Sequence, residues 1–246
     1  MKFIQNYSVY AHDADSRGIM RSGAYTKYMQ EAANQQLRYE KPSYYELFDS
    51  GLAFILSRIH IKIFKPLLRY DDFESLTWCC PSKGVVFQRC YEIRKGNELY
   101  AQANSAWALI GTADGSIKKV GDYDTSKYST DEPLDTVQSL RFRIPKELPL
   151  EHIGKKRVLY SEVDCNMHLN NRFYPDVICD CIDGIENLFV TEINISFISE
   201  APMGSEMDIY SSKPDENGLI YFRTKIGEKT NIEAFVRVTP YKEVQA

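Results

Sequence analysis

Apolar residues recur along the chain first with a helical spacing and then in alternation with polar residues. This succession of two patterns occurs twice. In the segment 22–37 apolar side chains return every three or four positions, which predicts a helix, and they are Tyr25, Tyr28, Met29, Ala32, Ala33 and Leu37. The segment 170–182 has the same spacing, carried by Phe173, Tyr174, Val177, Ile178, Cys181 and Ile182. Ser22 and either Asn170 or Asn171 stand where a side chain can cap the first turn. Both segments are apolar over a wide arc, as expected of a helix that a sheet encloses.

Each predicted helix is followed by residues that alternate between apolar and polar. The segments 59–63 and 193–197 alternate strictly, which predicts half-buried strands. Further strands are expected at 73–80, 85–94 and 99–110, and again at 207–212, 219–226 and 232–239. Turn sequences such as Asn217-Gly218 separate them. The order of elements is therefore the same in both halves: a strand, a long helix and then antiparallel strands.

The region between the halves has a different composition. Residues 122–150 are rich in Asp, Ser, Thr and Pro, which is typical of a linker or of a strap across the surface. We therefore expect an N-terminal half at 1–121, a linker at 122–154 and a C-terminal half at 155–246. The 246 residues are sufficient for one domain built by duplication. The expected fold class is α+β, with each helix packed on an antiparallel sheet.

Composition excludes several classes of protein. A net charge of −4 and a pI near 5.7 argue against nucleic acid or an anionic membrane as the main partner. The six cysteines include no Cys-x-x-Cys pair, so reduced cysteines in the core are favoured over a metal site or disulfides. The N-terminal segment does not resemble a signal peptide, and no apolar run reaches the length of a transmembrane helix. A cytoplasmic protein is expected.

A polar segment precedes each predicted helix, and the two segments are diverged copies. Asp15 stands ten positions before Tyr25, and Asp164 stands ten positions before Tyr174. Aligned in this way, the second copy has Asn166 and His168 where the first has Arg17 and Ile19, as the aligned positions read. The first copy therefore lacks the side chains that could carry chemistry.

The second copy, Asp164-x-Asn166-x-His168, is the strongest candidate for a catalytic site. Histidine suits proton transfer near neutral pH, the aspartate could fix its tautomer, and an asparagine amide could hold a carbonyl. Backbone N–H groups at the start of the following helix suit a developing oxyanion. A polar turn that caps a helix explains the same residues equally well. A metal site is less favoured, because no second His or Cys stands at ligand spacing nearby.

The segment 160–174 resembles the active-site segment of the acyl–acyl carrier protein (acyl-ACP) thioesterases, whose pattern is D-x-N-x-H-[VL]-N-N-x-x-Y. The resemblance covers most of the chain. In the first half, the segment 103–107 resembles the family's A-x-S-x-W strand. The resemblance implies a double hotdog fold, in which two helices are each wrapped by an antiparallel sheet within one chain.

The resemblance also implies a catalytic glutamate after the first long strand of the second half. Glu200 occupies this place, and Ala201 stands where the family often has a cysteine, so a thiol nucleophile is excluded at that position. Aligning the alternating strands places Pro66 opposite Glu200, so the first half is expected to shape the acyl pocket. The implied catalytic set is Asp164, Asn166, His168 and Glu200, with Glu200 either as general base or as nucleophile.

The function that this resemblance implies is hydrolysis of fatty acyl-ACP to free fatty acid and carrier thiol, without metal or organic cofactor. An acyl-CoA hydrolase, a hotdog dehydratase and a non-catalytic acyl-binding protein stay as alternatives. The expected partners are an acyl carrier protein and a fatty acyl chain, and a homodimer is left open. Basic residues that could steer the acidic carrier protein are Arg141, Arg143, Lys146, Lys155, Lys156, Arg157 and Arg172.

Overall fold

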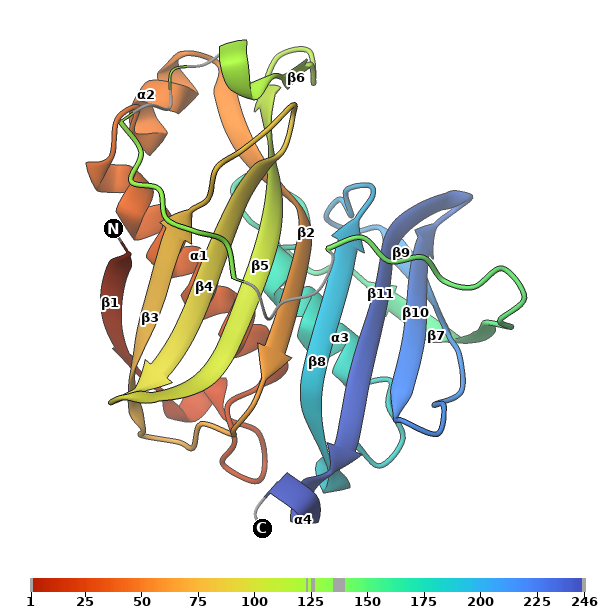
Figure 1. The fold of residues 1–246 in the computed structure, drawn as a ribbon. Helices are drawn as coiled ribbons and strands as arrows, with labels where there is room; N and C mark the ends of the chain where they lie inside the picture. Colours follow the sequence, from red (N-terminus) through yellow and green to blue (C-terminus); the bar gives the residue numbers. More distant parts are fainter. Residues whose placement is uncertain (1, 123, 125–126, 135–139, 245–246) are drawn as a thin grey trace.

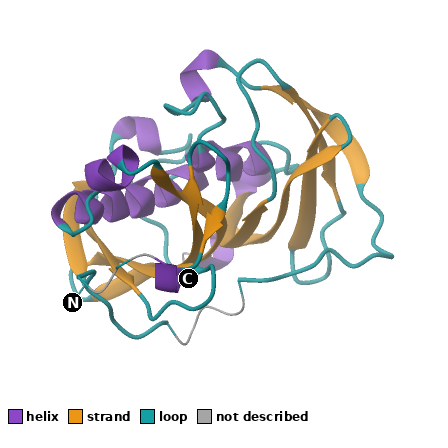
Figure 2. Cartoon of the chain, turned by 90° about the horizontal axis from the view of Figure 1, so that it is seen from above, coloured by secondary structure: helices purple, strands orange, loops and turns teal. Residues whose placement is uncertain are grey.

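The computed structural model describes residues 2–122, 124, 127–134 and 140–244. The chain folds into two halves that lie side by side and share one antiparallel sheet (Figure 1). Both halves place their helices on the same side of this sheet (Figure 2). This arrangement is the expected α+β double hotdog.

The first half contains the long helix and the four strands predicted after it. Its elements are β1 (Phe3–Ser8), α1 (Ser22–Tyr39), α2 (Tyr44–Asp49), β2 (Leu52–Ile63), β3 (Asp72–Cys79), β4 (Phe87–Lys95), β5 (Glu98–Gly111) and β6 (Ile117–Lys118). The predicted strands agree with β3, β4 and β5 to within two residues. Helix α2 was not predicted, although Ser43 and Glu46 form a capping box at its start. The predicted cap at Ser22 is wrong, because Ser22 is the first residue of α1 and Arg21 is the cap residue.

The second half repeats the plan with a shorter helix. Its elements are β7 (Glu151–Arg157), α3 (Tyr174–Cys179), β8 (Leu188–Phe197), β9 (Glu206–Ser211), β10 (Leu219–Ile226), β11 (Lys229–Pro240) and α4 (Tyr241–Val244). Asn170 caps the turn before α3, since its side chain accepts a hydrogen bond from Arg172 N at 3.1 Å. Helix α3 has only six residues, because the chain turns at Asp180 and Gly184 adopts a left-handed conformation with φ of 70°.

The two halves join where β2 pairs with β8. The sheet order is β1-β3-β4-β5-β2-β8-β11-β10-β9-β7, with β6 on β5. At the junction His60 lies opposite Asn194, flanked by pairs between isoleucines of the two strands. Because His60 and Asn194 occupy equivalent positions in the two halves, the approximate two-fold axis of the molecule passes between them. His60 Nε2 lies 2.7 Å from Glu192 Oε1 on β8, so a polar contact also holds the junction.

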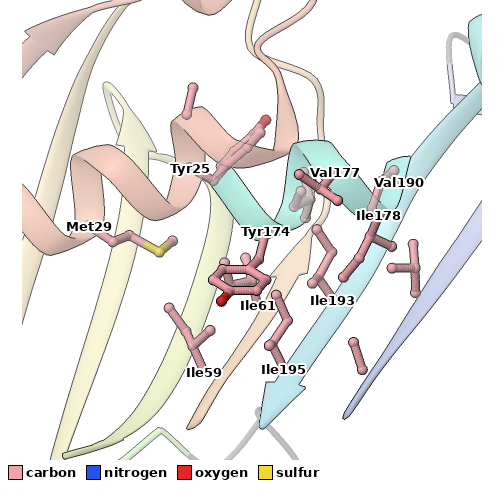
Figure 3. Packing of buried hydrophobic residues seen from close by; sticks show 14 of the residues in the cluster. Tyr25, Met29, Ile59, Ile61, Tyr174, Val177, Ile178, Val190, Ile193 and Ile195 are labelled. Carbon is pink, nitrogen blue, oxygen red and sulfur yellow. The ribbon is translucent and has the colours of Figure 1, made fainter. Parts of the chain in front are cut away.

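The alternating isoleucines place one continuous apolar core between the sheet and the helices. Ile61 and Ile193 are fully buried at the junction, and Met29 of α1 and Ile178 of α3 pack in the same cluster (Figure 3). Burying a side chain of this size stabilises the fold by about 1.5–3 kcal/mol. The β2–β8 junction is therefore part of the core and not a hinge between two separate domains.

The start of α1 lies directly against α3. The backbone N–H of Gly23 donates a hydrogen bond to Asp176 Oδ1 at 2.8 Å. A Cβ at Gly23 would collide with Asp176 Oδ2 and with Arg172 O. Burial raises the pKa of the Asp176 carboxyl. Glycine is thus required here for the close approach of the two helices.

The segment between the halves runs across the sheet. Trp78 Nε1 donates a hydrogen bond to Glu132 O at 2.8 Å, and the ring of Phe142 packs edge-on against that of Phe235. Strand β7 begins at Glu151, inside the range 122–154 that was expected to be a linker. Residues 123, 125–126 and 135–139 of that range lie outside the described residues. In the described part of the chain, no helix is long and apolar enough to cross a membrane.

Candidate active site

The loop before α3 is closed by its own backbone. Asp164 N donates a hydrogen bond to His168 O at 3.0 Å, and Met167 N donates to Asp164 O at the same distance. The Asp164 carboxylate accepts from Asn166 N at 2.9 Å. Met167 takes the left-handed conformation, with φ of 63°, that this tight turn requires. The turn fixes the positions from which Asn166 and His168 project.

A second loop, which follows β8, pairs with this turn. Leu169 N donates to Ala201 O at 2.8 Å, and Met203 N donates to Met167 O at 2.9 Å. These bonds bring Glu200 beside His168, with Glu200 Oε2 3.2 Å from His168 Nε2. The side chain of His168 is 28% exposed and that of Glu200 is 66% exposed, so both are accessible to water and substrate.

The Asp164 carboxylate contacts a different group from the one expected from the sequence. The hydrogen bond that its carboxylate accepts comes from the backbone of Asn166, not from the His168 ring. Asp164 therefore holds the loop that carries Asn166 and His168. The expected tautomer-fixing contact with His168 is not part of this geometry.

Two of the backbone donors at the helix start already have acceptors in the protein. Arg172 N donates to the side chain of Asn170, and Phe173 N donates to Asn170 O at 2.9 Å. The Asn166 side chain, in contrast, is exposed and accessible to a ligand.

The first half has the same loop but has no histidine or glutamate at the positions of His168 and Glu200. Asp15 Oδ1 accepts from Arg17 N at 2.8 Å, Asp15 N donates to Ile19 O at 2.7 Å, and Gly18 has a φ of 79°. Met20 N donates to Leu67 O as Leu169 N does to Ala201 O, so Pro66 is the counterpart of Glu200. These bonds confirm the alignment made from the sequence, and they show Ile19 where the second half has His168.

Arg17 turns this inactive loop into a clamp between the halves. Its guanidinium pairs with Asp15 Oδ2 at 2.7 Å. It also donates to Leu188 O at 2.6 Å and to Glu186 O at 3.0 Å, both in the second half. The group lies over the Tyr241 ring as well, 5.1 Å from its centroid. The residue at the position of Asn166 is thus structural in the first half.

A cavity of 570 Å³ lies in the first half and reaches the active-site loop. Most of its wall is apolar, and it includes Ala33, Leu37, Leu47, Leu52, Phe54, Phe87 and Trp107 from α1, α2 and the sheet. Cys165 and Asn166 are the residues that the second half contributes. The cavity is therefore a largely apolar space with Asn166 in its wall.

Asn231 was not expected to belong to the site. It is fully buried on β11, and its side-chain amide donates to Ser199 O and accepts from Thr224 Oγ1 at 2.9 Å. Its backbone oxygen accepts from Ser199 N at 3.0 Å. These bonds fix the residue that precedes Glu200. The sequence signal that could have identified this residue is a single asparagine in a strand whose other buried residues are apolar.

The cysteines lie at different depths. Cys80 and Cys90 are buried, whereas Cys165 is exposed in the active-site loop, which differs from the expected core position. Burial raises the pKa of the Cys179 thiol to about 12. Ala201, beside Glu200, is only 1% exposed. Within the described residues, no group of three or more His, Cys, Asp or Glu side chains could hold a metal ion.

Two family models match the two halves of the chain. The model described as the acyl-ACP thioesterase N-terminal domain matches residues 1–128. The model described as the acyl-ACP thioesterase C-terminal domain matches residues 149–239. No curated protein sequence matches the chain.

Solved structures with the same fold include two whole-length matches. An acyl-ACP thioesterase from Bacteroides thetaiotaomicron is 17% identical, with a TM-score of 0.84, and the match covers 97% of this chain and 98% of that one. The 12:0-ACP thioesterase from Umbellularia californica is 14% identical, with a TM-score of 0.81, and coverage of 97% and 94%. At these identities the likeness demonstrates the shared fold.

Proposed function

Because the chain belongs to the acyl-ACP thioesterase family, it is a thioester hydrolase acting on fatty acyl-ACP, and we propose that Asn166, His168 and Glu200 carry the reaction. The observation that supports this assignment is the 3.2 Å contact between His168 Nε2 and Glu200 Oε2. His168 follows Asn166, which lines the cavity, by two residues. A proton-transfer pair thus adjoins a site for an apolar chain.

The acyl chain lies in the cavity of the first half. Each methylene that leaves water contributes about 0.8 kcal/mol to binding. The chain enters so that the thioester carbonyl lies at Asn166, whose amide donates a hydrogen bond to the carbonyl oxygen. This bond strengthens as negative charge develops on the oxygen during attack.

Glu200 and His168 then move the protons of hydrolysis. Acting with His168, Glu200 takes a proton from water, and the water oxygen bonds to the carbonyl carbon. When the tetrahedral intermediate collapses, the carbon–sulfur bond breaks and the proton passes to the departing thiolate. Direct attack by Glu200 to form an anhydride is the variant of this mechanism, and water would then hydrolyse the anhydride. Asp164 acts as a positioning residue for the loop.

The carrier protein is the acidic partner of this reaction, and only some of the basic residues suit its docking. Lys155 Nζ pairs with Glu206 at 2.6 Å, and Lys156 Nζ pairs with Glu162 at 2.6 Å, so neighbouring carboxylates offset these two charges. Arg157 is exposed, and Arg172 lies over the Phe173 ring, 3.7 Å from its centroid. We assign the steering of the carrier to Arg157 and Arg172. A cytoplasmic location and a homodimer remain predictions from the sequence.

Turnover of matched substrates tests the function. Purified protein is given the same acyl chain on acyl carrier protein and on coenzyme A, and the free thiol and fatty acid are measured. We expect a higher kcat/KM on the carrier substrate, and no release above background by the His168→Ala variant. Equal or better turnover of acyl-CoA would assign the chain a CoA substrate. Binding without thiol release by wild type would identify a non-catalytic acyl-binding protein.

A further inference from the structure

Among the residues that the structure describes, one buried cationic side chain lines the cavity. Arg89 of β4 lines the cavity and is 9% exposed. Its guanidinium donates to Gln36 Oε1 at 2.5 Å, to Thr77 Oγ1 at 3.1 Å and to Cys79 Sγ at 3.0 Å. All three partners are neutral side chains. A pocket that binds only an alkyl chain does not need a guanidinium. Burying this charge without a counter-charge in contact lowers the stability of the fold.

The guanidinium of Arg89 has more N–H donors than the acceptors that it contacts. Arginine has five N–H bonds, and three of them are used by the three neutral acceptors. Two N–H bonds therefore have no acceptor among the described residues. An acceptor that enters the cavity could take up such an N–H bond and would be bound there.

Arg89 is connected to a carboxylate through one intervening side chain. Gln36 Nε2 donates to Glu40 Oε1 at 2.9 Å, while Gln36 Oε1 accepts from Arg89. Gln36 thus links the guanidinium to a carboxylate that does not touch it. Because one carboxylate already belongs to this network, the missing partner is better matched by a neutral acceptor than by a second anion.

The fold does not require a polar group at this position. Paired residues on neighbouring strands form a row across the sheet. In the row of Arg89, Arg89 pairs with Ser105, and Ser105 pairs with Ile59. The equivalent row in the second half starts from Ile193 and runs through Val236 to Ile220. Those three residues are buried and aliphatic. An arginine is therefore a feature of the half that contains the cavity, and the same sheet is built without it in the other half.

The row of Arg89 lies inward from the aromatic wall. Phe87 pairs with Trp107, and Arg89 follows on the next inward-facing row of the same two strands, toward the middle of the sheet. Phe87, Trp107 and Arg89 all line the cavity. A chain that passes the aromatic rings therefore meets the guanidinium.

We propose that Arg89 selects acyl chains that carry an oxygen substituent, a hydroxyl or an oxo group, along the part of the chain held in the cavity. The oxygen accepts a hydrogen bond from a free N–H of Arg89, whereas an unsubstituted chain leaves that donor unpaired. This specificity rests on the proposed function, since it requires the acyl chain to occupy the cavity.

A positional series of substrates tests the proposal. Wild type, Arg89→Met and the matched control Arg94→Met are given saturated acyl-ACP and hydroxyacyl-ACP of equal length, with the hydroxyl at successive carbons. Arg94 is on the same strand but pairs with Glu92 and does not line the cavity. We expect wild type and Arg94→Met to prefer at least one hydroxylated isomer by about tenfold in kcat/KM, as for a hydrogen bond to a charged group. Arg89→Met should lose that preference and gain on the saturated chain.

Each outcome decides the proposal. If wild type prefers the saturated chain over every isomer, the proposal is wrong, whether or not Arg89→Met folds. A preference that Arg89→Met retains would also exclude it, as would a stronger preference for a chain ending in a carboxylate. Hydrolysis of saturated acyl-ACP without any preference refutes only this inference. Failure to hydrolyse every acyl-ACP refutes the proposed function.

Discussion

Gly23 of α1 and Asp176 of α3 touch across the junction of the two halves, with a hydrogen bond of 2.8 Å from the glycine N–H to the carboxylate. No space exists for a side chain between them. The substitution Gly23→Ala should lower the free energy of unfolding by about 1–3 kcal/mol, because the helices must separate. Denaturant titration measures the change. Gly121→Ala is the control, since a Cβ there would meet nothing within 4 Å, and equal effects of the two would contradict this account.

Removing either member of the proton-transfer pair should abolish most activity without unfolding the protein. We expect Glu200→Gln and His168→Ala each to lower kcat by roughly 10²–10⁴-fold. The double variant should be little slower than either single one, as expected of groups that act as a unit. Glu206→Gln, which removes another exposed carboxylate, is the control. Near-normal turnover by Glu200→Gln would remove Glu200 from the mechanism.

The two loop aspartates should differ in their effect on rate. Asp164→Asn disturbs the loop that places Asn166 and His168, so kcat should fall by roughly 10- to 100-fold. Asp15→Asn should leave kcat within a few-fold of wild type, although loss of the ion pair with Arg17 should lower the melting temperature. Steady-state kinetics and thermal unfolding measure both effects. A similar loss of kcat in the two variants would show that the first-half loop takes part in catalysis.

The β2–β8 junction should be sensitive to acid. The hydrogen bond with His60 lowers the pKa of the Glu192 carboxyl below its ordinary value of 4.5, and Arg237 contributes in the same direction. A carboxyl with a depressed pKa stabilises the fold fully above pH 4.5, and this contribution is lost as the pH falls through the lowered value. Glu192→Gln should therefore flatten the stability profile in that acidic range. Denaturant titrations at several pH values test it, and an unchanged profile would show that other carboxyls dominate.

Carrier docking should respond to charge reversal at Arg157 and Arg172. We expect Arg157→Glu and Arg172→Glu to raise KM for acyl-ACP, with a smaller effect at high salt because exposed charges are screened. KM for a short synthetic thioester should stay the same, since it makes no contact with that surface. Lys155→Glu is the comparison, because Glu206 already offsets the lysine charge. An equal effect of all three changes would point to general charge and not to docking.

Much of the fold and the pairing of the two site loops could be predicted because both leave a regular trace in the sequence. The alternation at 59–63 and 193–197 identified the two central strands, and the alignment of these strands placed Glu200 opposite Pro66. The observed backbone hydrogen bonds confirm that alignment. What could not be predicted depends on contacts between distant residues. The support of Ser199 by Asn231 and the place of Arg89 in the cavity have no periodic signal.

The antiparallel pairing of β2 with β8 is symmetric about His60 and Asn194, so two identical chains could build the same sheet. In such an assembly every substitution would occur twice, once on each side of the axis. A fused chain removes this constraint, because each side has its own codons. One side could exchange histidine and glutamate for Ile19 and Pro66, while only that side acquired an arginine beneath its aromatic wall. Covalent fusion thus permits an asymmetric enzyme on a nearly symmetric frame.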